Sequence, residues 1–290
     1  MRHASLATLA LLASTTALAQ PANLPSAIYT DPVADPAHPA RMEVLHIPSG
    51  TVAINGVAYL SAGPGVHPTV IICHGLPGNE KNLDLAQAVR RAGWNAITFN
   101  YRGSWGSPGN YRFAQNPEDA EAVLAFLRDP QNAAKYGIDT KHIAIVGHSM
   151  GGWVAATVGG QDNGLLGVGM ISAANMGREG AQGRAEAIKL MTDNMEALAG
   201  VTPEIMADEA IANHDTFDFL HQAKGLAGKP VLILSSDDGL APQTDELAKA
   251  IRANGSTKLQ TLHVATDHSW SDKRIALQAS IINWVQSLLN

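Results

Sequence analysis

Apolar positions follow two different periods along the chain. Short, nearly continuous apolar runs such as 69–73 are typical of strands that are covered on both faces of a parallel sheet. Longer segments with apolar residues at helical spacing follow them, as in 82–92, where Gly93 supplies the stop signal. Strands are predicted over 42–47, 51–60, 69–73, 95–99, 142–146, 165–172, 231–235 and 258–264, and helices over 82–92, 149–158, 244–253 and 274–289. This alternation indicates one α/β domain with a mostly parallel sheet.

Turn and capping residues mark several element boundaries. The first two predicted strands are separated by Pro48, Ser49 and Gly50, a short spacing that suits an antiparallel hairpin. A further helix is predicted to open at Asn116 and Pro117, because the Asn side chain can cap the helix and the Pro fits its first turn.

One segment interrupts the alternation. About 55 residues between the strands at 165–172 and 231–235 carry helical pattern but no convincing strand, which is more than a usual crossover needs. Helices are predicted over 185–198 and over 203–213, the second opened by Thr202. We interpret about 174–228 as a helical cap inserted in the domain; the alternative is a surface excursion with no role in substrate contact.

The amino-terminal residues have the pattern of an export signal. A short basic start is followed by the apolar stretch 6–18 and by Ala17, Leu18 and Ala19, a small-x-small cleavage site. We expect cleavage after Ala19 and therefore a periplasmic or secreted mature protein of 290 − 19 = 271 residues. A Pro-rich lead-in over 20–41 precedes the domain at 42–290. The alternative is a cytosolic protein with an apolar amino-terminal helix.

Composition excludes several classes of protein. The chain is 46% apolar and 16% charged, below the roughly 25% charged residues of an ordinary globular domain, so it should fold around a large core. A net charge of −6 gives no basic surface for nucleic acid or anionic membrane, and no stretch is long enough for an integral membrane anchor. Cys73 is the only cysteine, forms no intrachain disulfide, and is expected to be a buried small hydrophobe.

The segment 147–152 carries the strongest chemical signal. It reads Gly-His-Ser-Met-Gly-Gly and lies where a predicted strand gives way to a predicted helix. In this Gly-x-Ser-x-Gly pattern, small residues two before and two after the Ser relieve crowding and leave its hydroxyl exposed above the sheet. Ser149 is the candidate nucleophile. A serine that only caps the helix is the alternative.

A serine nucleophile needs a base and a carboxylate that orients the base. The loop after the strand 231–235 supplies Asp237 and Asp238, and the loop after 258–264 supplies His268. Both loops lie at carboxyl ends of strands, where functional groups of open α/β sheets gather. Residue spacing alone does not separate the two adjacent acids.

These residues resemble the α/β-hydrolase superfamily, in its dienelactone-hydrolase-like and prolyl-oligopeptidase-like esterase branch, from about residue 42 to the end. The order of nucleophile, acid and histidine matches Ser149, Asp238 and His268. The resemblance implies an eight-stranded, mostly parallel sheet with helices on both faces. It also selects Asp238, four residues before the loop proline Pro242, as the acid.

The resemblance further implies an oxyanion hole of backbone N–H groups. Met150, which follows the nucleophile, would supply one, and Leu76 in the His-Gly loop after the strand 69–73 would supply the other. Pro77 has no N–H to donate. Trp105 and His148 are the candidate substrate-binding residues. Tyr111 and Phe113 either line the same wall or only seat their loop, and Arg102 is expected to form a structural ion pair.

The sequence lacks the motifs of competing chemistries: the phosphate-binding Walker loop, His-Glu-x-x-His, Cys-x-x-Cys and the dinucleotide-binding glycine pattern. We therefore expect a serine esterase that needs no cofactor and no metal and acts on a small-molecule ester. A peptidase of the prolyl-oligopeptidase-like branch and a ligand-binding protein on a hydrolase scaffold are the alternatives. The oligomeric state and the acyl and alcohol preferences are not predicted.

Overall fold

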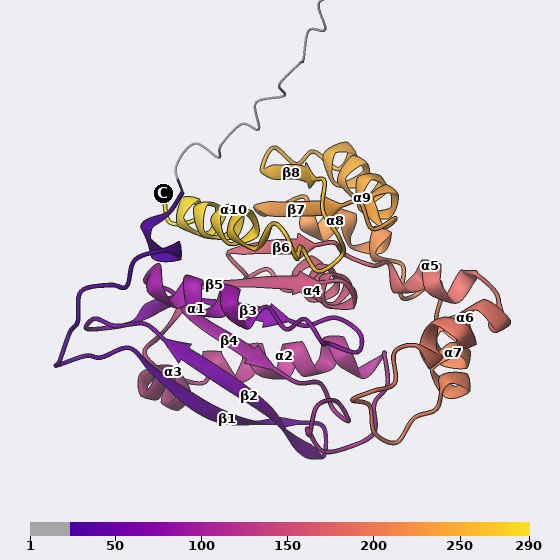
Figure 1. Cartoon of the computed structure of the whole chain (residues 1–290), viewed down its shortest axis with the longest axis horizontal. Coiled ribbons are helices and arrows are strands. Elements are labelled where there is room, and N and C mark those ends of the chain that lie inside the picture. The colour runs from indigo at the N-terminus through magenta and orange to yellow at the C-terminus, as the bar shows by residue number, and fades with distance from the viewer. Residues whose placement is uncertain (1–23) are drawn as a thin grey trace, which may run out of the picture.

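The computed structural model describes residues 24–290, and one eight-stranded sheet runs through this part of the chain (Figure 1). The strands are β1 Arg41–Ser49, β2 Val52–Leu60, β3 His67–Cys73, β4 Asn95–Phe99, β5 Ile138–His148, β6 Gly167–Ile171, β7 Val231–Ser236 and β8 Leu259–Val264. They lie in the order β1-β2-β4-β3-β5-β6-β7-β8. The β1–β2 hairpin and the β2–β4 pair are antiparallel, and all other neighbours are parallel. The predicted sheet is confirmed.

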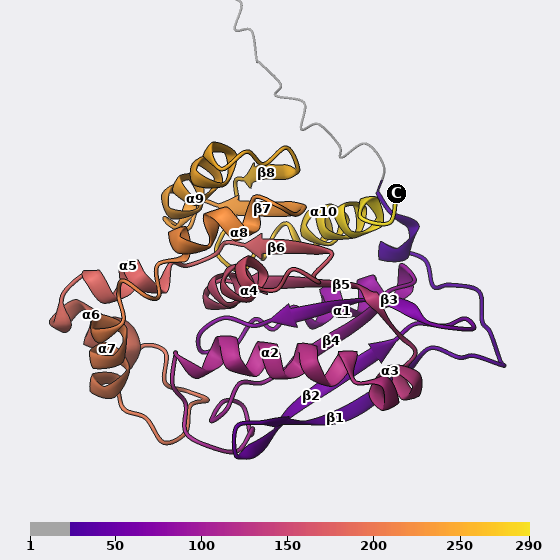
Figure 2. The same cartoon turned by 180° about the vertical axis from the view of Figure 1, so that it is seen from behind.

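Helices cover both faces of this sheet. They are α1 Leu83–Arg91, α2 Gln115–Arg128, α3 Pro130–Tyr136, α4 Met150–Gln161, α5 Met176–Ala181, α6 Arg184–Thr192, α7 Pro203–Ala212, α8 Ala223–Leu226, α9 Ala241–Ala253 and α10 Arg274–Ser287, with 3₁₀ turns at Ser26–Ile28 and Phe219–Gln222. α1 and α10 lie on the face seen in Figure 1, and α2 and α4 lie on the face seen in Figure 2. Each layer of helices encloses its own apolar cluster.

Strand β3 shows why its sequence is a continuous apolar run. Val70 and Ile72 belong to the cluster under α1 and α10, whereas Ile71 and Cys73 belong to the cluster under α2 and α4. Successive side chains of a strand point to opposite faces, so a strand that is covered on both sides needs apolar residues at every position. Cys73 is buried and free, as expected, and burial raises the pKa of its thiol to about 12.

The capping prediction for Asn116 is wrong. α2 begins at Gln115, one residue earlier, and Asn116 is buried in its first turn with its Nδ2 donating to the hydroxyl of Tyr111 at 2.9 Å. The carboxylate of Glu209 in α7 instead accepts hydrogen bonds from the backbone of Phe113 and Ala114 at 3.0 and 2.9 Å. A carboxylate from a distant segment serves the positive end of the helix, and Asn116 is free to make a buried contact.

Helix α3 was not predicted, although its ends carry ordinary signals. The side chain of Asp129 accepts hydrogen bonds from two amides of its first turn, Pro130 is its first residue, and Gly137 ends it at φ 63°. With only seven residues, the helix is too short to show an apolar period of its own.

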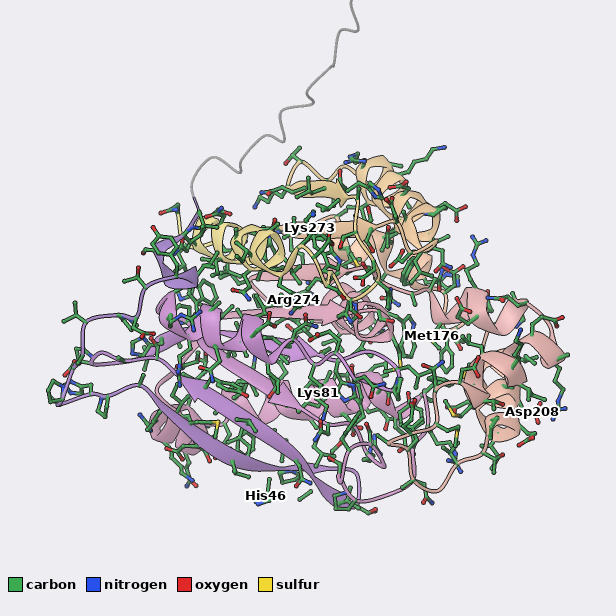
Figure 3. All side chains as sticks on the ribbon, in the orientation of Figure 1. His46, Lys81, Met176, Asp208, Lys273 and Arg274 are labelled. Atoms are coloured by element: carbon green, nitrogen blue, oxygen red, sulfur yellow. The ribbon has the colours of Figure 1, made fainter. Side chains whose placement is uncertain are left out.

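Residues 174–228, called the insertion below, contain helices and turns and no strand. The insertion starts beyond the carboxyl end of β6 and extends away from the sheet (Figure 1). The predicted helix at 185–198 is found as α6 and ends earlier, and the side chain of Thr202 caps α7 as predicted. Met176 lies at the root of the insertion and Asp208 lies toward its outer end (Figure 3).

The predicted signal peptide, residues 1–19, lies outside the described residues. The lead-in from residue 24 to residue 40 contains one 3₁₀ turn and no strand. None of the helices between residues 24 and 290 combines the length and the apolar character that crossing a bilayer requires.

Candidate active site

Ser149 occupies the tight turn between β5 and α4. Its backbone has φ 57° and ψ −125°, a conformation that a residue with a side chain rarely adopts. Its N–H donates to the carbonyl of Ile171 at 2.9 Å, and its carbonyl accepts from the N–H groups of Gly152 and Ala174 at 2.8 and 3.1 Å. These bonds hold the strained turn from both sides, as expected for a nucleophile at a strand-to-helix elbow.

Two glycines make this turn possible. A Cβ on Gly147 would lie 1.8 Å from the carbonyl oxygen of Gly151, and a Cβ on Gly151 would lie 2.2 Å from the carbonyl oxygen of Cys73. Both contacts are far inside van der Waals distance and both are with backbone, which has little room to yield. The structure therefore shows directly why small residues stand two before and two after Ser149.

Asp238 and His268 are in direct contact. The Nδ1–H of His268 donates to Oδ2 of Asp238 at 2.7 Å, and the N–H of Leu240 donates to Oδ1 at 2.9 Å. The Asp238 side chain is only 4% exposed. Burial by itself would raise the pKa of this carboxyl, but the hydrogen bonds from His268, Leu240 and Ser236 outweigh burial and lower the pKa to about 2. The carboxylate is thus ionised at neutral pH.

The neighbouring acid points elsewhere. The side chain of Asp237 is 62% exposed, and its Oδ1 accepts a hydrogen bond from Nε2 of His263 on β8 at 2.9 Å. Of the two adjacent acids that the sequence left open, only Asp238 has His268 as a hydrogen-bond partner.

His148 supports His268 from the side of the elbow. Its Nε2–H donates to the carbonyl of His268 at 2.8 Å, and the two ring centroids lie 4.7 Å apart. Burial, reinforced by the charge of nearby His268, lowers the pKa of His148 to about 4. The ring is therefore neutral, and because its Nε2–H is committed to this carbonyl, His148 is placed to position His268.

The loop after β3 passes directly over Ser149. A Cβ on Gly75 would lie 2.8 Å from Cβ and 3.3 Å from Oγ of Ser149, so only a glycine lets the chain approach this closely. The next residue is Leu76, which is joined to Pro77 by a cis peptide bond. Within residues 24–290, neither the N–H of Leu76 nor that of Met150 has a hydrogen-bond acceptor. Two free amides beside a serine hydroxyl are what an oxyanion hole requires.

Comparison with known proteins agrees with this geometry. Residues 70–276 match the alpha/beta hydrolase family. The chain belongs to this family. The match begins in β3 and ends in α10, so it includes the elbow, both loops at the carboxyl ends of β7 and β8, and the insertion.

Solved structures of this fold are similar over most of the chain. A hyperthermophilic esterase from the archaeon Pyrobaculum calidifontis has a TM-score of 0.67 at 17% identity and covers 87% of this chain and 88% of its own. A thermostable carboxylesterase from a metagenomic library has a TM-score of 0.66 at 21% identity over 91% and 92%. An acylaminoacyl peptidase from Pyrococcus horikoshii has a TM-score of 0.65 at 15% identity over 85% of this chain and 41% of its own. These identities show a shared fold.

Among curated proteins, an uncharacterised protein of Mycobacterium tuberculosis is 28% identical over 125 residues. The matched region spans 43% of this chain and 43% of that relative, less than half of either.

Trp105 packs onto the loop that passes over Ser149. Its indole N–H donates to the carbonyl of Pro77 at 2.6 Å, and Nζ of Lys81 lies 4.0 Å from the centre of its ring. Tyr111 and Phe113 are buried core residues that seat the loop. Substrate contact by Trp105 and by His148 stays a prediction.

Arg102, in the same loop, forms the expected structural ion pairs. Its Nε lies 2.6 Å from the carboxylate of the buried Asp119, and its Nη2 lies 2.6 Å from that of Glu118. Both acids belong to α2, so the pairs fasten the loop after β4 to the helix beneath it.

Arg274 connects the histidine loop with the start of α1, a link that the sequence does not announce. Its guanidinium donates to the carboxylate of Asp84, to Oδ1 of Asn82 at 3.0 Å and to the carbonyl of Ser269 at 3.0 Å. In the view of Figure 3, Arg274 and Lys81 lie near the centre of the face that α1 and α10 cover. An arginine at the first position of a helix matches no catalytic motif, so only the fold reveals its role.

No group of three or more His, Cys, Asp and Glu side chains between residues 24 and 290 is arranged to hold a metal ion. The chemistry available at the site is that of the hydroxyl, the imidazole, the carboxylate and the two free amides.

Proposed function

We propose that this alpha/beta hydrolase is an exported serine esterase of the carboxylesterase type. Oγ of Ser149 attacks the carbonyl carbon of an ester while His268 takes its proton, and the protonated His268 then gives this proton to the leaving alcohol. Asp238 holds Nδ1–H and stabilises the imidazolium. A water molecule, activated by His268, hydrolyses the acyl-enzyme and restores the serine.

The backbone amides of Leu76 and Met150 stabilise the oxygen of the attacked carbonyl as it becomes negative. Donors that are already in place cost no reorganisation during the reaction, and one such donor is worth a factor of about 10²–10³ in rate. Their lack of acceptors elsewhere in the described chain supports this role.

One observation carries the proposal: a buried, ionised carboxylate holds the imidazole of His268 at the sheet edge where Ser149 stands on a strained elbow. Burying a carboxylate and straining a serine turn both cost folding free energy, whereas an exposed ion pair or a relaxed turn would not. Backbone strain that is kept in a well-packed part of a protein is typical of a functional site.

The test is covalent labelling of Ser149 by a fluorophosphonate probe, together with turnover of short p-nitrophenyl esters. Wild-type protein should label, and Ser149→Ala should lose labelling and at least about 10³-fold of kcat/KM. Ser280→Ala, which removes a hydroxyl bonded within α10, is the matched control and should behave as wild type.

Full turnover by Ser149→Ala would refute the nucleophile assignment. Wild-type protein that neither labels nor turns over any ester would point to a ligand-binding protein on this scaffold. Faster cleavage of aminoacyl p-nitroanilides than of esters would replace the esterase by a peptidase with the same triad.

Export rests on residues 1–19 alone and has its own test. The full-length chain expressed in a Gram-negative host should be recovered in the periplasm or medium, and its first residue should be Gln20. A cytosolic product that retains Met1 would remove export from the proposal and leave the chemistry untouched.

A further inference from the structure

A line of buried hydrogen bonds continues from Asp238 on the side away from His268. The hydroxyl of Ser236 donates to the carboxylate of Asp238, and Oγ of Ser236 lies 2.7 Å from Oγ of Ser172. The indole Nε1–H of Trp270 donates to Oγ of Ser172 at 3.0 Å. Ser172, Ser236 and Trp270 are all buried, so water does not compete for these bonds.

The two ends of this line fix the direction of every proton in it. An indole N–H can only donate, and an ionised carboxylate can only accept. The hydroxyl of Ser172 therefore accepts from Trp270 and donates to Ser236, and Ser236 accepts from Ser172 and donates to Asp238. Each donor strengthens the next, because a hydroxyl that accepts a hydrogen bond becomes a better donor.

The backbone is distorted where it supplies two of these groups. Ser172 has φ 44° and Trp270 has φ 59°, both in the left-handed region that residues with side chains rarely occupy. The N–H of Ser172 donates to the carbonyl of Leu234 at 2.7 Å, which fixes the end of β6 against β7. Such strain persists only where the surroundings impose it.

This line of hydrogen bonds also connects Asp238 with the loop that carries His268. Trp270 is two residues beyond His268, and its buried indole reaches back to the ends of β6 and β7. The histidine loop is thus attached to Asp238 twice, once through the imidazole and once through the indole and two hydroxyls.

We propose that Ser172, Ser236 and Trp270 are positioning residues that orient the Asp238 carboxylate toward His268 and keep it ionised. This inference rests on the proposed function, in which Asp238 is the acid of the triad. None of the three touches the reacting atoms. They act through Asp238: their hydrogen bonds fix the orientation of its carboxylate group and stabilise its negative charge.

Three variants remove one donor each: Ser236→Ala, Ser172→Ala and Trp270→Phe. The matched control is Ser49→Ala, because the hydroxyl of Ser49 is buried and donates to another buried carboxylate, that of Asp119, at 2.5 Å. Two quantities are measured on each folded variant: the pH profile of kcat/KM for a p-nitrophenyl ester, and the downfield proton resonance of the His268 Nδ1–H···Asp238 hydrogen bond.

Losing a donor leaves more negative charge on the carboxylate, which then pulls harder on the Nδ1 proton. We expect the resonance to move downfield and the acid limb of the kcat/KM profile to move to higher pH in Ser236→Ala. kcat should fall about tenfold with KM unchanged, because one hydrogen bond to a charged group is lost. Ser49→Ala should change neither the resonance nor the acid limb.

The double variant Ser172→Ala/Trp270→Phe distinguishes a connected line from independent packing. In a connected line the indole has no role once Ser172 has lost its hydroxyl, so the double variant should be no slower than Ser172→Ala. Losses that multiply would overturn the proposal. An unmoved resonance in Ser236→Ala would also overturn it.

If Ser236→Ala does not fold, Trp270→Phe is the deciding variant, because it keeps an aromatic ring in place and removes only the indole N–H donor. A smaller downfield shift of the His268 resonance supports the proposal, and an unmoved resonance overturns it. The resonance needs no substrate. A protein that turns over no ester and does not label would refute the proposed function, while the resonance would still test the line.

Discussion

The carboxyl edge of the sheet and the outer surface of the insertion have different kinds of polar contact. At the sheet edge, the side chains of Ser172, Ser236 and Trp270 are buried and form hydrogen bonds with one another. In the insertion, the ion pair between Arg184 and Asp208 joins side chains that are 55% and 56% exposed. Exposed pairs of this kind contribute about 0–1 kcal/mol, whereas a buried polar group that loses its partner costs more.

The insertion is attached to the sheet domain at several places, through side chains such as Glu209 and Arg178 and through one strip of main chain. The backbone of Ala199 donates to the carbonyl of Gly103 at 2.7 Å, and the N–H of Trp105 donates to the carbonyl of Ala197 at 2.9 Å. This strip of main chain joins the insertion to the loop whose Trp105 packs on Pro77. The comparison teaches that buried polar contacts hold the sheet edge, whereas the insertion meets the loop after β4 through main-chain hydrogen bonds.

The sharpest test of this difference uses the two adjacent acids. Asp238→Asn should lower kcat/KM by about 10³–10⁴-fold, because an amide at this position favours the wrong tautomer of His268. Asp237→Asn, an isosteric change one residue away, should alter kcat/KM less than threefold, since its carboxylate faces His263 at the surface. Steady-state kinetics on both proteins measures the contrast. A larger loss in Asp237→Asn would transfer the role of acid.

The Asp238→Asn variant also gives a pH signature. The pKa of Asp238 is lowered from 3.8 to about 2 in the folded protein, so its ionised form adds stability above the unfolded pKa. This contribution is lost as pH falls from about 4 to about 2. The stability difference between wild type and Asp238→Asn, measured by urea unfolding, should therefore shrink over this range.

Much of the fold follows from local sequence because the elements have strong, simple periods. All eight strands were predicted. Central strands such as β3 and β4 are continuous apolar runs because both faces of the sheet are covered there, whereas the edge strands β1 and β8 are largely exposed. One prediction depended on a distant partner and could not be made correctly from the sequence. Asn116 is not the cap of α2, because Glu209, more than ninety residues away, supplies the carboxylate.

Some residues of the candidate site could likewise be predicted from local sequence, and others could not. The Gly-x-Ser-x-Gly motif and the loops at strand ends indicate Ser149 and His268 because the chemistry leaves a fixed local spacing. The choice between Asp237 and Asp238 needed a resemblance, and only the structure shows which carboxylate contacts the imidazole. Ser172, Ser236, Trp270 and Arg274 carry no local pattern, since their partners come together only when the sheet has formed.

The smallest expected effect concerns the attachment of the insertion through Glu209. Glu209→Gln replaces one carboxylate oxygen by an NH₂ group, so one of the two amides at the start of α2 loses its acceptor. We expect a loss of about 1–2 kcal/mol in unfolding free energy, measured by urea denaturation. The control is Asp208→Asn on the same helix, which breaks the exposed pair with Arg184 and should cost less than about 0.5 kcal/mol. Equal losses of unfolding free energy in the two variants would show that the Glu209 contact with the sheet domain is no stronger than the exposed ion pair on the insertion. Strong polar contacts would then be limited to the buried groups at the carboxyl edge of the sheet.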